Sequence, residues 1–434
     1  MKVAFHTLGC KVNQYETEAM KEQFLQAGFE VVSEDDIADC YVINTCTVTN
    51  IADRKSRQYI RKMKTLSKDA VIAVCGCYSQ VNPFELAKMP EVDIVMGNGE
   101  KNTLVYHVLS TLKLKSVNAP YETFVKVLPY ERLTEYNDHG IITSMEGKTR
   151  AYIKIQEGCD RFCSYCLIPY ARGHVRSRNQ DEIVEEAKML VKNGFKEIVL
   201  TGINTALCDD LEGVIKRIND IPGDFRIRLS SLEPTVVNSE YVKKLLGNEK
   251  LCHHLHLSIQ SGSDKTIKSM NRNYTRDEYM DIVKVVRDFD PGYGITTDII
   301  VGFPGETEED FRDSLDIVNR VKFGKVHTFK YSKRKGTLAE KMPNQVDGNI
   351  KNERSLRLIE AGEKASNEFM ESLIGTNRKV LFEEKVRGKN EITGYTDNYI
   401  KVYTELDKNN INKIIEVRLT KIYKDGMKGE IING

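Results

Sequence analysis

The chain has 434 residues, 40% apolar residues and a formal net charge of +1. This length predicts two to four domains, and the balanced charge gives no general sign of a nucleic-acid partner. The absence of an apolar run of about 18 residues excludes a membrane-spanning helix, and the first residues lack a signal-peptide core. Ten cysteines without a secretion signal predict a cytoplasmic protein whose thiols act as ligands rather than in disulfides.

Residues 1–114 alternate strand and helix patterns. The expected strands are 2–6, 29–33, 39–44, 70–74 and 92–96, and the expected helices are 15–26, 52–64 and 103–112. Such alternation predicts an α/β domain with a parallel sheet covered on both faces, flavodoxin-like in size. Residues 115–148 are less regular, and we expect a linker with one hairpin and a turn at 137–140.

A second alternation occupies residues 149–374. Its expected strands are 151–156, 197–201, 226–230, 254–260, 295–301 and 326–331, and its helices include 180–193, 276–289, 308–321 and 354–373. Thr307 is the predicted N-cap of the third of these helices, with Asp310 at the capping-box position. Six βα units are too few for a closed eight-stranded barrel, so a partial (β/α)6 barrel is expected. Residues 375–434 show short alternating strands, which predict a small all-β barrel.

Cys159, Cys163 and Cys166 form C-x3-C-x2-C in the stretch Glu-Gly-Cys-Asp-Arg-Phe-Cys-Ser-Tyr-Cys. Iron–sulfur clusters are held by cysteine thiolates, usually four, so three ligands leave one iron open for a substrate or cofactor. A zinc loop is the alternative, but zinc requires a fourth Cys or His nearby, and His174 is the only nearby candidate in the sequence.

Three further cysteines stand just beyond predicted strands. Cys10, Cys46 and Cys77 follow the first, third and fourth strands, whose carboxyl ends share the ligand-binding edge of a parallel sheet. The residues alone leave open whether these thiols bind a metal cluster or are buried. Buried apolar positions are expected for Cys40, Cys208 and Cys252, because free cysteine is commonly found in cores. Cys75 falls within or at the end of a strand, and its role is undecided.

The Cys159 loop resembles the cluster motif of the radical S-adenosylmethionine (SAM) superfamily, including the aromatic Tyr165 before the third cysteine. The stretches 7–18 (Thr-Leu-Gly-Cys-Lys-Val-Asn-Gln-Tyr-Glu-Thr-Glu), 44–49 (Asn-Thr-Cys-Thr-Val-Thr) and 75–80 (Cys-Gly-Cys-Tyr-Ser-Gln) resemble the N-terminal domain of the methylthiotransferases. Residues 375–434 are similar to an RNA-binding TRAM domain. The resemblance implies two 4Fe–4S clusters, one on Cys159, Cys163 and Cys166, and an auxiliary one on Cys10, Cys46 and Cys77.

Family chemistry implies that SAM is used twice. One molecule methylates a sulfur carried on the auxiliary cluster, and a second is cleaved to the radical that abstracts hydrogen from the substrate. The SAM contacts that the resemblance implies are Tyr165, Gly202, Gln260 and Ser261, although the last three also fit strand-to-helix turns. Arg172 and Arg176 follow the cluster loop and are candidates for binding a substrate carboxylate or phosphate, with an exposed, solvated position as the alternative.

The substrate expectation rests on two basic runs and on family details. Residues 54–64 hold six basic and no acidic residues, and residues 330–335 hold four more, which could contact RNA or be solvated surface. The sequence most resembles the branch acting on N6-threonylcarbamoyladenosine at position 37 of tRNA, beside the anticodon. Isopentenyladenosine in tRNA or a ribosomal-protein aspartate are sibling substrates, and a non-catalytic iron–sulfur RNA-binding protein is the alternative from another class. If the chain is such an enzyme, the resemblance implies a flavodoxin- or ferredoxin-type electron donor and a sulfur source as partners.

Overall fold

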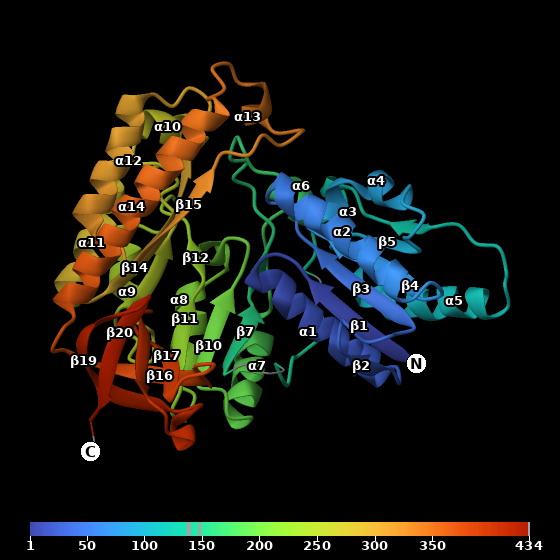
Figure 1. Cartoon of the computed structure of the whole chain (residues 1–434), viewed down its shortest axis with the longest axis horizontal. Coiled ribbons are helices and arrows are strands. Elements are labelled where there is room, and N and C mark those ends of the chain that lie inside the picture. The colour runs from blue at the N-terminus through green and yellow to red at the C-terminus, as the bar shows by residue number, and fades with distance from the viewer. Residues whose placement is uncertain (137–139, 146–148, 433–434) are drawn as a thin grey trace. The chain divides into compact units, whose positions relative to one another are not determined.

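The structure is a computed structural model that describes residues 1–136, 140–145 and 149–432. It forms two compact units (Figure 1). The N-terminal unit comprises Met1–Ser144, Lys154–Asn179 and Ser332–Glu340, and the core unit comprises Met145–Ile153, Gln180–Tyr331 and Lys341–Gly434. The turn expected at 137–140 falls largely outside the described residues. The division into segments 1–114, 115–148, 149–374 and 375–434 stays a prediction.

The N-terminal unit contains a six-stranded parallel sheet of order β2-β1-β3-β4-β5-β6. Its strands are β1 (Lys2–Thr7), β2 (Glu30–Val32), β3 (Cys40–Thr45), β4 (Val71–Gly76), β5 (Ile94–Met96) and β6 (Phe124–Lys126). The first five strands follow the flavodoxin-like order, in which the order of adding strands reverses between β1 and β3. The expected flavodoxin-like domain is therefore confirmed. The hairpin expected in the linker is wrong for the described residues, because β6 pairs in parallel with β5.

Helices cover both faces of this sheet. They are α1 (Lys11–Gln26), α2 (Asn50–Leu66), α3 (Cys77–Val81), α4 (Pro83–Ala87) and α5 (Leu104–Ser116). Met20 and Phe24 of α1 pack on one face together with Leu104 of α5. Ile60 and Met63 of α2 pack on the other. Alternate strand residues supply the two cores, as the period of two in a strand requires.

The core unit contains two parallel sheets in the orders β11-β10-β7 and β12-β13-β14-β15. The strands are β7 (Arg150–Lys154), β10 (Glu197–Thr201), β11 (Arg226–Leu229), β12 (Ser231–Leu232), β13 (His254–Leu257), β14 (Gly294–Val301) and β15 (Lys325–Lys330). A parallel bridge between Ile227 and Leu251 links the sheets. Since β11 and β12 are two parts of one interrupted strand, the predicted six-stranded partial barrel is confirmed.

The helices of this unit follow its strands in the chain. They are α7 (Gln180–Lys192), α8 (Leu211–Asn219), α9 (Ser239–Leu245), α10 (Asp264–Ser269), α11 (Arg276–Phe289), α12 (Glu308–Val321) and α14 (Gly348–Ser372). Thr307 caps α12 through a capping box with Asp310, as predicted. Figure 1 shows α11, α12 and α14 side by side along the sheet. No helix in the described ranges is long and apolar enough to cross a membrane.

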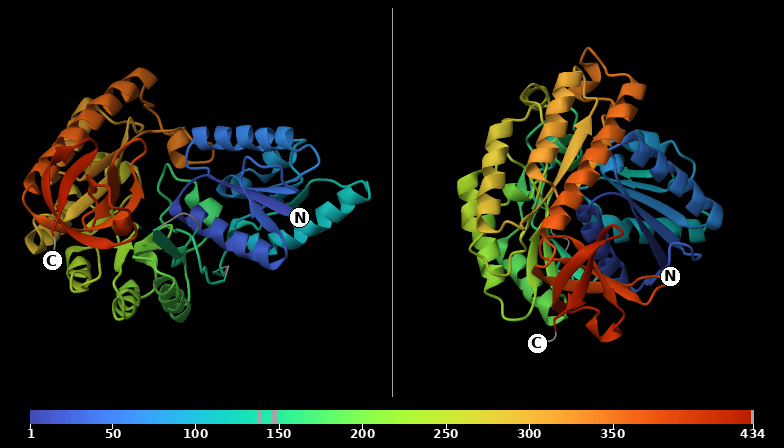
Figure 2. Two further views of the ribbon diagram at one scale, coloured as in Figure 1. Left: turned by 60° about the horizontal axis from the view of Figure 1, so that its bottom comes forward. Right: turned by 60° about the vertical axis from the view of Figure 1, so that its left-hand side comes forward.

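The C-terminal segment closes into a five-stranded barrel of order β16-β17-β18-β20-β19 (Figure 2). Its strands are β16 (Asn377–Lys385), β17 (Glu391–Thr396), β18 (Lys401–Glu405), β19 (Ile414–Tyr423) and β20 (Gly426–Ile431). Val380, Val402 and Leu419 fill its interior together with Phe369 of α14. The small all-β barrel predicted from the sequence is confirmed.

Candidate cluster sites

Three thiols lie at the carboxyl edge of the N-terminal sheet. Cys10 precedes α1, Cys46 directly follows β3, and Cys77 is the first residue of α3 after β4. Because β1, β3 and β4 are neighbours in the sheet, their three following loops lie side by side at the switch point, where doubly wound sheets bind ligands. Cys75, whose role the sequence left undecided, is fully buried and packs in the core on one face of the sheet.

The loops after β1 and β3 approach so closely that a glycine is required. Gly9 has φ +111°, and a Cβ added there would lie 2.9 Å from Cys46 Cβ and 3.2 Å from Cys46 Sγ. A side chain would therefore displace Cys46 or Cys10, the residue after Gly9. The glycine in the Thr-Leu-Gly-Cys stretch brings two of the three thiol-bearing loops together.

The pKa values of the Cys10 and Cys46 thiols reflect their nearness to Cys77. The Cys10 residue keeps exposed surface. Desolvation by the surrounding protein raises the pKa of its thiol, Arg172 lowers it and the neighbouring Cys77 raises it. Burial and the nearby Cys77 also raise the pKa of Cys46, to about 12. Because a cysteine ligand binds as the thiolate, iron must displace a proton from each of these thiols.

Arg172 ends the short helix α6 (Ile168–Arg172), which follows the Cys159 loop, and is completely buried. Its Nε donates a hydrogen bond to Cys77 Sγ at 3.2 Å. Its Nη atoms donate to Glu157 at 2.8 Å, to Glu16 at 3.1 Å and to Asn13 at 2.5 Å. Burial alone would lower the pKa of Arg172, but Cys77, Glu16 and Glu157 raise it well above its ordinary value. The guanidinium therefore stays charged beside the Cys77 sulfur.

Two lysines complete this buried charge network. Lys101 Nζ lies 2.5 Å from Glu16, and Lys154 Nζ lies 3.2 Å from Glu16 and 2.8 Å from Glu157. Arg172, Lys101 and Lys154 thus face Glu16 and Glu157, and Arg176 lies 4.0 Å from Glu157. Cations therefore outnumber carboxylates in this buried network. Such an excess of positive charge suits the negative charge that a thiolate-ligated cluster would carry.

Both arginines predicted to bind substrate are enclosed by protein. Arg172 has four protein partners, and Arg176, also buried, donates from Nη2 to the backbone oxygen of Arg172 at 2.5 Å. These contacts orient the guanidinium groups inward. Direct binding of a substrate carboxylate by Arg172 or Arg176 stays a prediction that this arrangement does not favour.

The Cys159 loop is held by its own backbone. Cys159 N donates to the oxygen of Gly173 at 3.0 Å, and Cys166 N donates to the oxygen of Cys163 at 2.9 Å. Gly158 precedes the loop with φ +75°, and a Cβ there would lie 1.7 Å from the His174 oxygen. The loop therefore has its turn fixed before the first cysteine, while Cys159 and Cys166 keep part of their surface exposed and Cys163 is buried.

Aromatic side chains border this loop. Tyr130, Phe162 and Tyr170 form edge and tilted ring contacts, with centroids 5.7–6.2 Å apart. His174, the fourth ligand that a zinc site would need, lies with Nδ1 3.1 Å from the Tyr130 hydroxyl and 3.2 Å from Asp160 Oδ1. These contacts engage Nδ1 of His174. Tyr165, a predicted SAM contact, is half-buried.

The other predicted SAM contacts belong to the core unit. Gly202 follows β10, and Gln260 has φ +65° and exchanges backbone hydrogen bonds with β14 through Asp298 and Ile300. Ser261 is completely buried and accepts a hydrogen bond from Ser263 N at 3.2 Å. All three positions follow carboxyl ends of barrel strands, where barrel enzymes place their sites. Their contact with SAM stays a prediction.

Sequence reasoning missed a polar group at the same edge of the core unit. Asn204 Nδ2 donates to Glu233 Oε2 at 2.6 Å, and Arg272 lies 3.6 Å from Glu233 Oε1. These side chains follow β10, β12 and α10, so no local motif joins them. Only the position of Asn204 and Glu233 directly after strands could have indicated part of the group.

The basic runs divide into exposed and paired residues. Arg54 and Lys55 on α2 are exposed, whereas Arg57 and Lys62 contact Glu85 and Asp35 at 3.0 Å. Arg334 is buried and binds Asp53 at 2.8 Å, so its expected RNA contact is wrong: its guanidinium is used within the N-terminal unit.

Comparison with known proteins decides the family. Residues 153–318 match the model of the radical SAM superfamily, and residues 2–97 match an uncharacterized protein family, UPF0004. The threonylcarbamoyladenosine tRNA methylthiotransferase MtaB of Bacillus subtilis (strain 168) is 41% identical over 429 residues, covering 96% of this chain and 94% of that protein. This chain belongs to the radical SAM methylthiotransferase family.

Two further comparisons concern a second type of tRNA-modifying relative and a solved structure with a similar fold. The tRNA-2-methylthio-N(6)-dimethylallyladenosine synthase of Acetivibrio thermocellus is 35% identical over 441 residues, covering 98% of this chain and 90% of that protein. The radical SAM methyltransferase TsrM of Kitasatospora setae, solved with cobalamin and a 4Fe–4S cluster, has a TM-score of 0.57 at 16% identity, covering 76% of this chain and 74% of that one. The latter similarity confirms the fold class.

As a radical SAM methylthiotransferase, the chain is an enzyme that transfers sulfur-containing groups and uses 4Fe–4S clusters and SAM. The residues present fit that requirement. Each cysteine triple offers three thiolates on short loops, and the buried excess positive charge adjoins Cys77. Cys40, Cys75, Cys208 and Cys252 are buried, which confirms the expectation for Cys40, Cys208 and Cys252.

Proposed function

We propose that this enzyme converts N6-threonylcarbamoyladenosine at position 37 of tRNA, beside the anticodon, to its 2-methylthio derivative. The reaction replaces the C2–H bond of the purine by a C2–S bond to a methylthio group. The observation that carries the proposal is 41% identity to an MtaB protein over nearly the whole chain, against 35% to a dimethylallyladenosine synthase.

The six cysteines have separate tasks in this proposal. Cys159, Cys163 and Cys166 hold the cluster that binds SAM, and Cys10, Cys46 and Cys77 hold the auxiliary cluster. The bound groups supply a 5′-deoxyadenosyl radical that takes the hydrogen from C2, together with the sulfur and methyl group that replace it. The protein supplies fixed ligands, a dry charge network and the positions Tyr165, Gly202, Gln260 and Ser261 toward SAM.

Arg172 holds the auxiliary ligand set in this scheme. Its hydrogen bonds orient Cys77 and tie it to Glu16 and Glu157, so the ligand does not swing away when the thiolate forms. Hydrogen bonds to the sulfur ligands and local charge are two means by which a protein sets cluster potential. The arrangement supports Arg172 as a positioning residue rather than a substrate ligand.

The tRNA partner is supported by the names of the relatives and by the C-terminal barrel, which we propose as a TRAM-like RNA-binding domain. Exposed Arg54 and Lys55 on α2 are the part of the basic run best placed to contact phosphates. The reaction also requires an electron donor of the flavodoxin or ferredoxin type and a sulfur source. Since tRNA is the proposed substrate, we propose a cytoplasmic location.

The second candidate substrate is isopentenyladenosine in tRNA, because dimethylallyladenosine synthases are also similar over 98% of this chain. Nucleoside mass spectrometry of tRNA from a deletion strain distinguishes the two. Loss of 2-methylthio-N6-threonylcarbamoyladenosine, restored by the wild-type gene and not by Cys163→Ala, supports the proposal. Its persistence together with loss of the isopentenyl derivative would overturn it.

A non-catalytic iron–sulfur RNA-binding role predicts a different result. Anaerobic reduction of the reconstituted protein with SAM should produce 5′-deoxyadenosine if the Cys159 loop holds a radical SAM cluster. Absence of 5′-deoxyadenosine from protein with a full iron content would favour the non-catalytic role. The Cys163→Ala variant is the control, because it removes one ligand of that cluster alone.

A further inference from the structure

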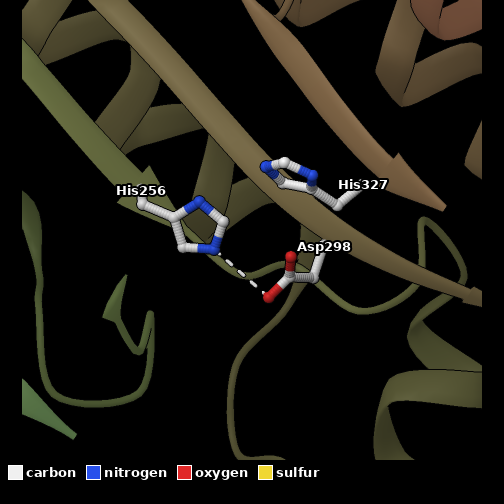
Figure 3. A group of neighbouring side chains, drawn as sticks. All are labelled: His256, Asp298 and His327. Carbon is white, nitrogen blue, oxygen red and sulfur yellow. Dashed lines mark hydrogen bonds and ion pairs between the residues drawn. The ribbon is translucent and has the colours of Figure 1, made fainter. Parts of the chain in front are cut away.

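Three metal-binding side chains lie together inside the core unit, outside both cysteine triples. His256 on β13, Asp298 on β14 and His327 on β15 occupy three successive parallel strands. Asp298 pairs directly with His327 in the strand register, and His256 pairs with Thr296, two residues before Asp298. Figure 3 shows the His256 ring joined to the Asp298 carboxylate by a dashed line, with the His327 ring close to both.

The distances suit one small cation. His256 Nε2 lies 3.2 Å from Asp298 Oδ2, and one donor atom from each of the three residues lies within 4.8 Å of the others. Bonds of about 2.0–2.2 Å to nitrogen and oxygen place neighbouring ligand atoms about 3 to 3.5 Å apart. The His256–Asp298 pair already has this spacing.

Partners behind the donors orient them for a metal. His256 Nδ1 lies 2.9 Å from Thr296 Oγ1, which also contacts His254 Nε2 at 3.0 Å. When Thr296 accepts the Nδ1 proton, Nε2 is the nitrogen left to bind a metal in place of its contact with Asp298 Oδ2. Ser258 Oγ lies 2.9 Å from Asp298 Oδ2 and 3.0 Å from His256 Nε2. A histidine fixed through its second nitrogen and a hydrogen-bonded carboxylate are the usual surroundings of metal ligands.

The ligand types define the class of ion. Two imidazoles and one carboxylate form the set that binds zinc and non-haem ferrous iron with coordination positions left for water or a substrate oxygen. The side chains of His256 and Asp298 are 15% and 26% exposed, so an ion can reach them from solvent. Among the described residues, this is the one group of three His, Cys, Asp or Glu side chains with donor atoms this close.

We propose that His256, Asp298 and His327 form a binding site for a divalent transition-metal ion of the zinc or ferrous class, separate from both iron–sulfur clusters. The site follows from the geometry of three strands of the core unit and does not depend on the tRNA substrate.

Zinc is the suitable probe because it is redox-inert and distinguishable from cluster iron. The enzyme with both clusters reconstituted is incubated anaerobically with zinc, desalted and analysed for zinc per chain and by zinc K-edge X-ray absorption. We expect about one zinc per chain with a nitrogen and oxygen shell that includes imidazole scattering. A shell containing sulfur, which would place zinc on cysteines, or no retained zinc would overturn the proposal.

Matched variants assign the ion to these residues. His327→Gln and Asp298→Asn should each weaken zinc binding at least tenfold in competition with a chromophoric chelator, whereas His107→Gln, a histidine of the N-terminal unit, should not. Thr296→Val should weaken binding by about 10- to 100-fold, because it removes the partner that orients His256. Unchanged iron content and melting temperature show that a variant is folded. If Asp298→Asn fails to fold, the exposed His327→Gln still decides, and unchanged affinity there would overturn the proposal.

Discussion

Arg172 Nε donates a hydrogen bond to the sulfur of Cys77 at 3.2 Å, which joins the helix after one cysteine triple to a member of the other. Both residues belong to the N-terminal unit, as do all six proposed cluster ligands. The bond makes the environment of the auxiliary site depend on a residue six positions beyond Cys166. The segment that follows the Cys159, Cys163 and Cys166 loop is thus connected to Cys77 by one side chain.

Replacing Arg172 by Met should impair the auxiliary cluster specifically. The change removes a buried positive charge and leaves Glu16 and Glu157 with fewer partners, which costs about 3–5 kcal/mol for a broken buried pair. We expect reduced auxiliary iron content and a more negative reduction potential in the molecules that retain the cluster. EPR-monitored redox titration with iron analysis measures both. Arg172→Lys keeps the positive charge but loses the planar guanidinium group. It should therefore restore the reduction potential more fully than the hydrogen bonds that hold Cys77 in place.

Gly158→Ala should disrupt the Cys159 loop. The added methyl group would lie 1.7 Å from the His174 oxygen, and φ +75° is strained for alanine. Iron and sulfide analysis should show loss of one cluster and retention of the auxiliary one. Gly194→Ala is the matched control: it also has positive φ, at +92°, but open space around it, so it should cost only about 1 kcal/mol and no iron. Equal iron loss in both variants would show that backbone strain alone is responsible.

Glu197→Gln should weaken the attachment of the C-terminal barrel to the partial barrel. Glu197 binds Arg226 at 2.6 Å and Arg228 at 2.7 Å. These arginines in turn donate to backbone oxygens of the C-terminal barrel, including that of Tyr395 at 3.0 Å and that of Asp397 at 3.1 Å. Losing the buried carboxylate leaves two arginines underpaired, with an expected cost of about 3–5 kcal/mol. Differential scanning calorimetry of wild type and variant measures the cost.

The contacts of Glu197 with Arg226 and Arg228 also predict how the stability of the folded chain depends on pH. Burial alone would raise the pKa of Glu197, but Arg228 and Arg226 hold it well below its ordinary value. A depressed carboxyl pKa stabilises the folded chain above the unfolded value of about 4.3 and loses that contribution as pH falls below it. The difference in unfolding free energy between wild type and Glu197→Gln should therefore be constant between about pH 6 and pH 8. It should shrink below about pH 4. A difference that grows toward low pH would contradict this role.

Much of the fold was predictable because its signals are local. The strand and helix of each βα unit show their own periodicity, and α11 and α12 have the predicted limits because Thr275 and Thr307 form capping boxes. The convergence of Cys10, Cys46 and Cys77 followed from parallel topology alone. The short β6 was missed because its three residues lie in an irregular segment and owe their conformation to pairing with β5.

The surroundings of the sites were less predictable because they depend on tertiary contacts. Arg172 was predicted to bind substrate, with an exposed position as the alternative, whereas it is buried against Glu16, 156 residues earlier in the chain. His256, Asp298 and His327 come from three separate strands and form no motif. Sequence shows which side chains can carry charge or bind metal, whereas only the fold shows which of them are neutralised by a partner.

The most direct measurement of the central claim uses the reconstituted enzyme, SAM, a reductant and an anticodon stem-loop containing N6-threonylcarbamoyladenosine. Mass spectrometry of the digested RNA should show the 2-methylthio product and 5′-deoxyadenosine with wild-type enzyme. Cys163→Ala should give neither, and Cys46→Ala should give 5′-deoxyadenosine without the product. Product formation by Cys46→Ala, or methylthiolation of an isopentenyladenosine stem-loop in preference to this one, would contradict the account.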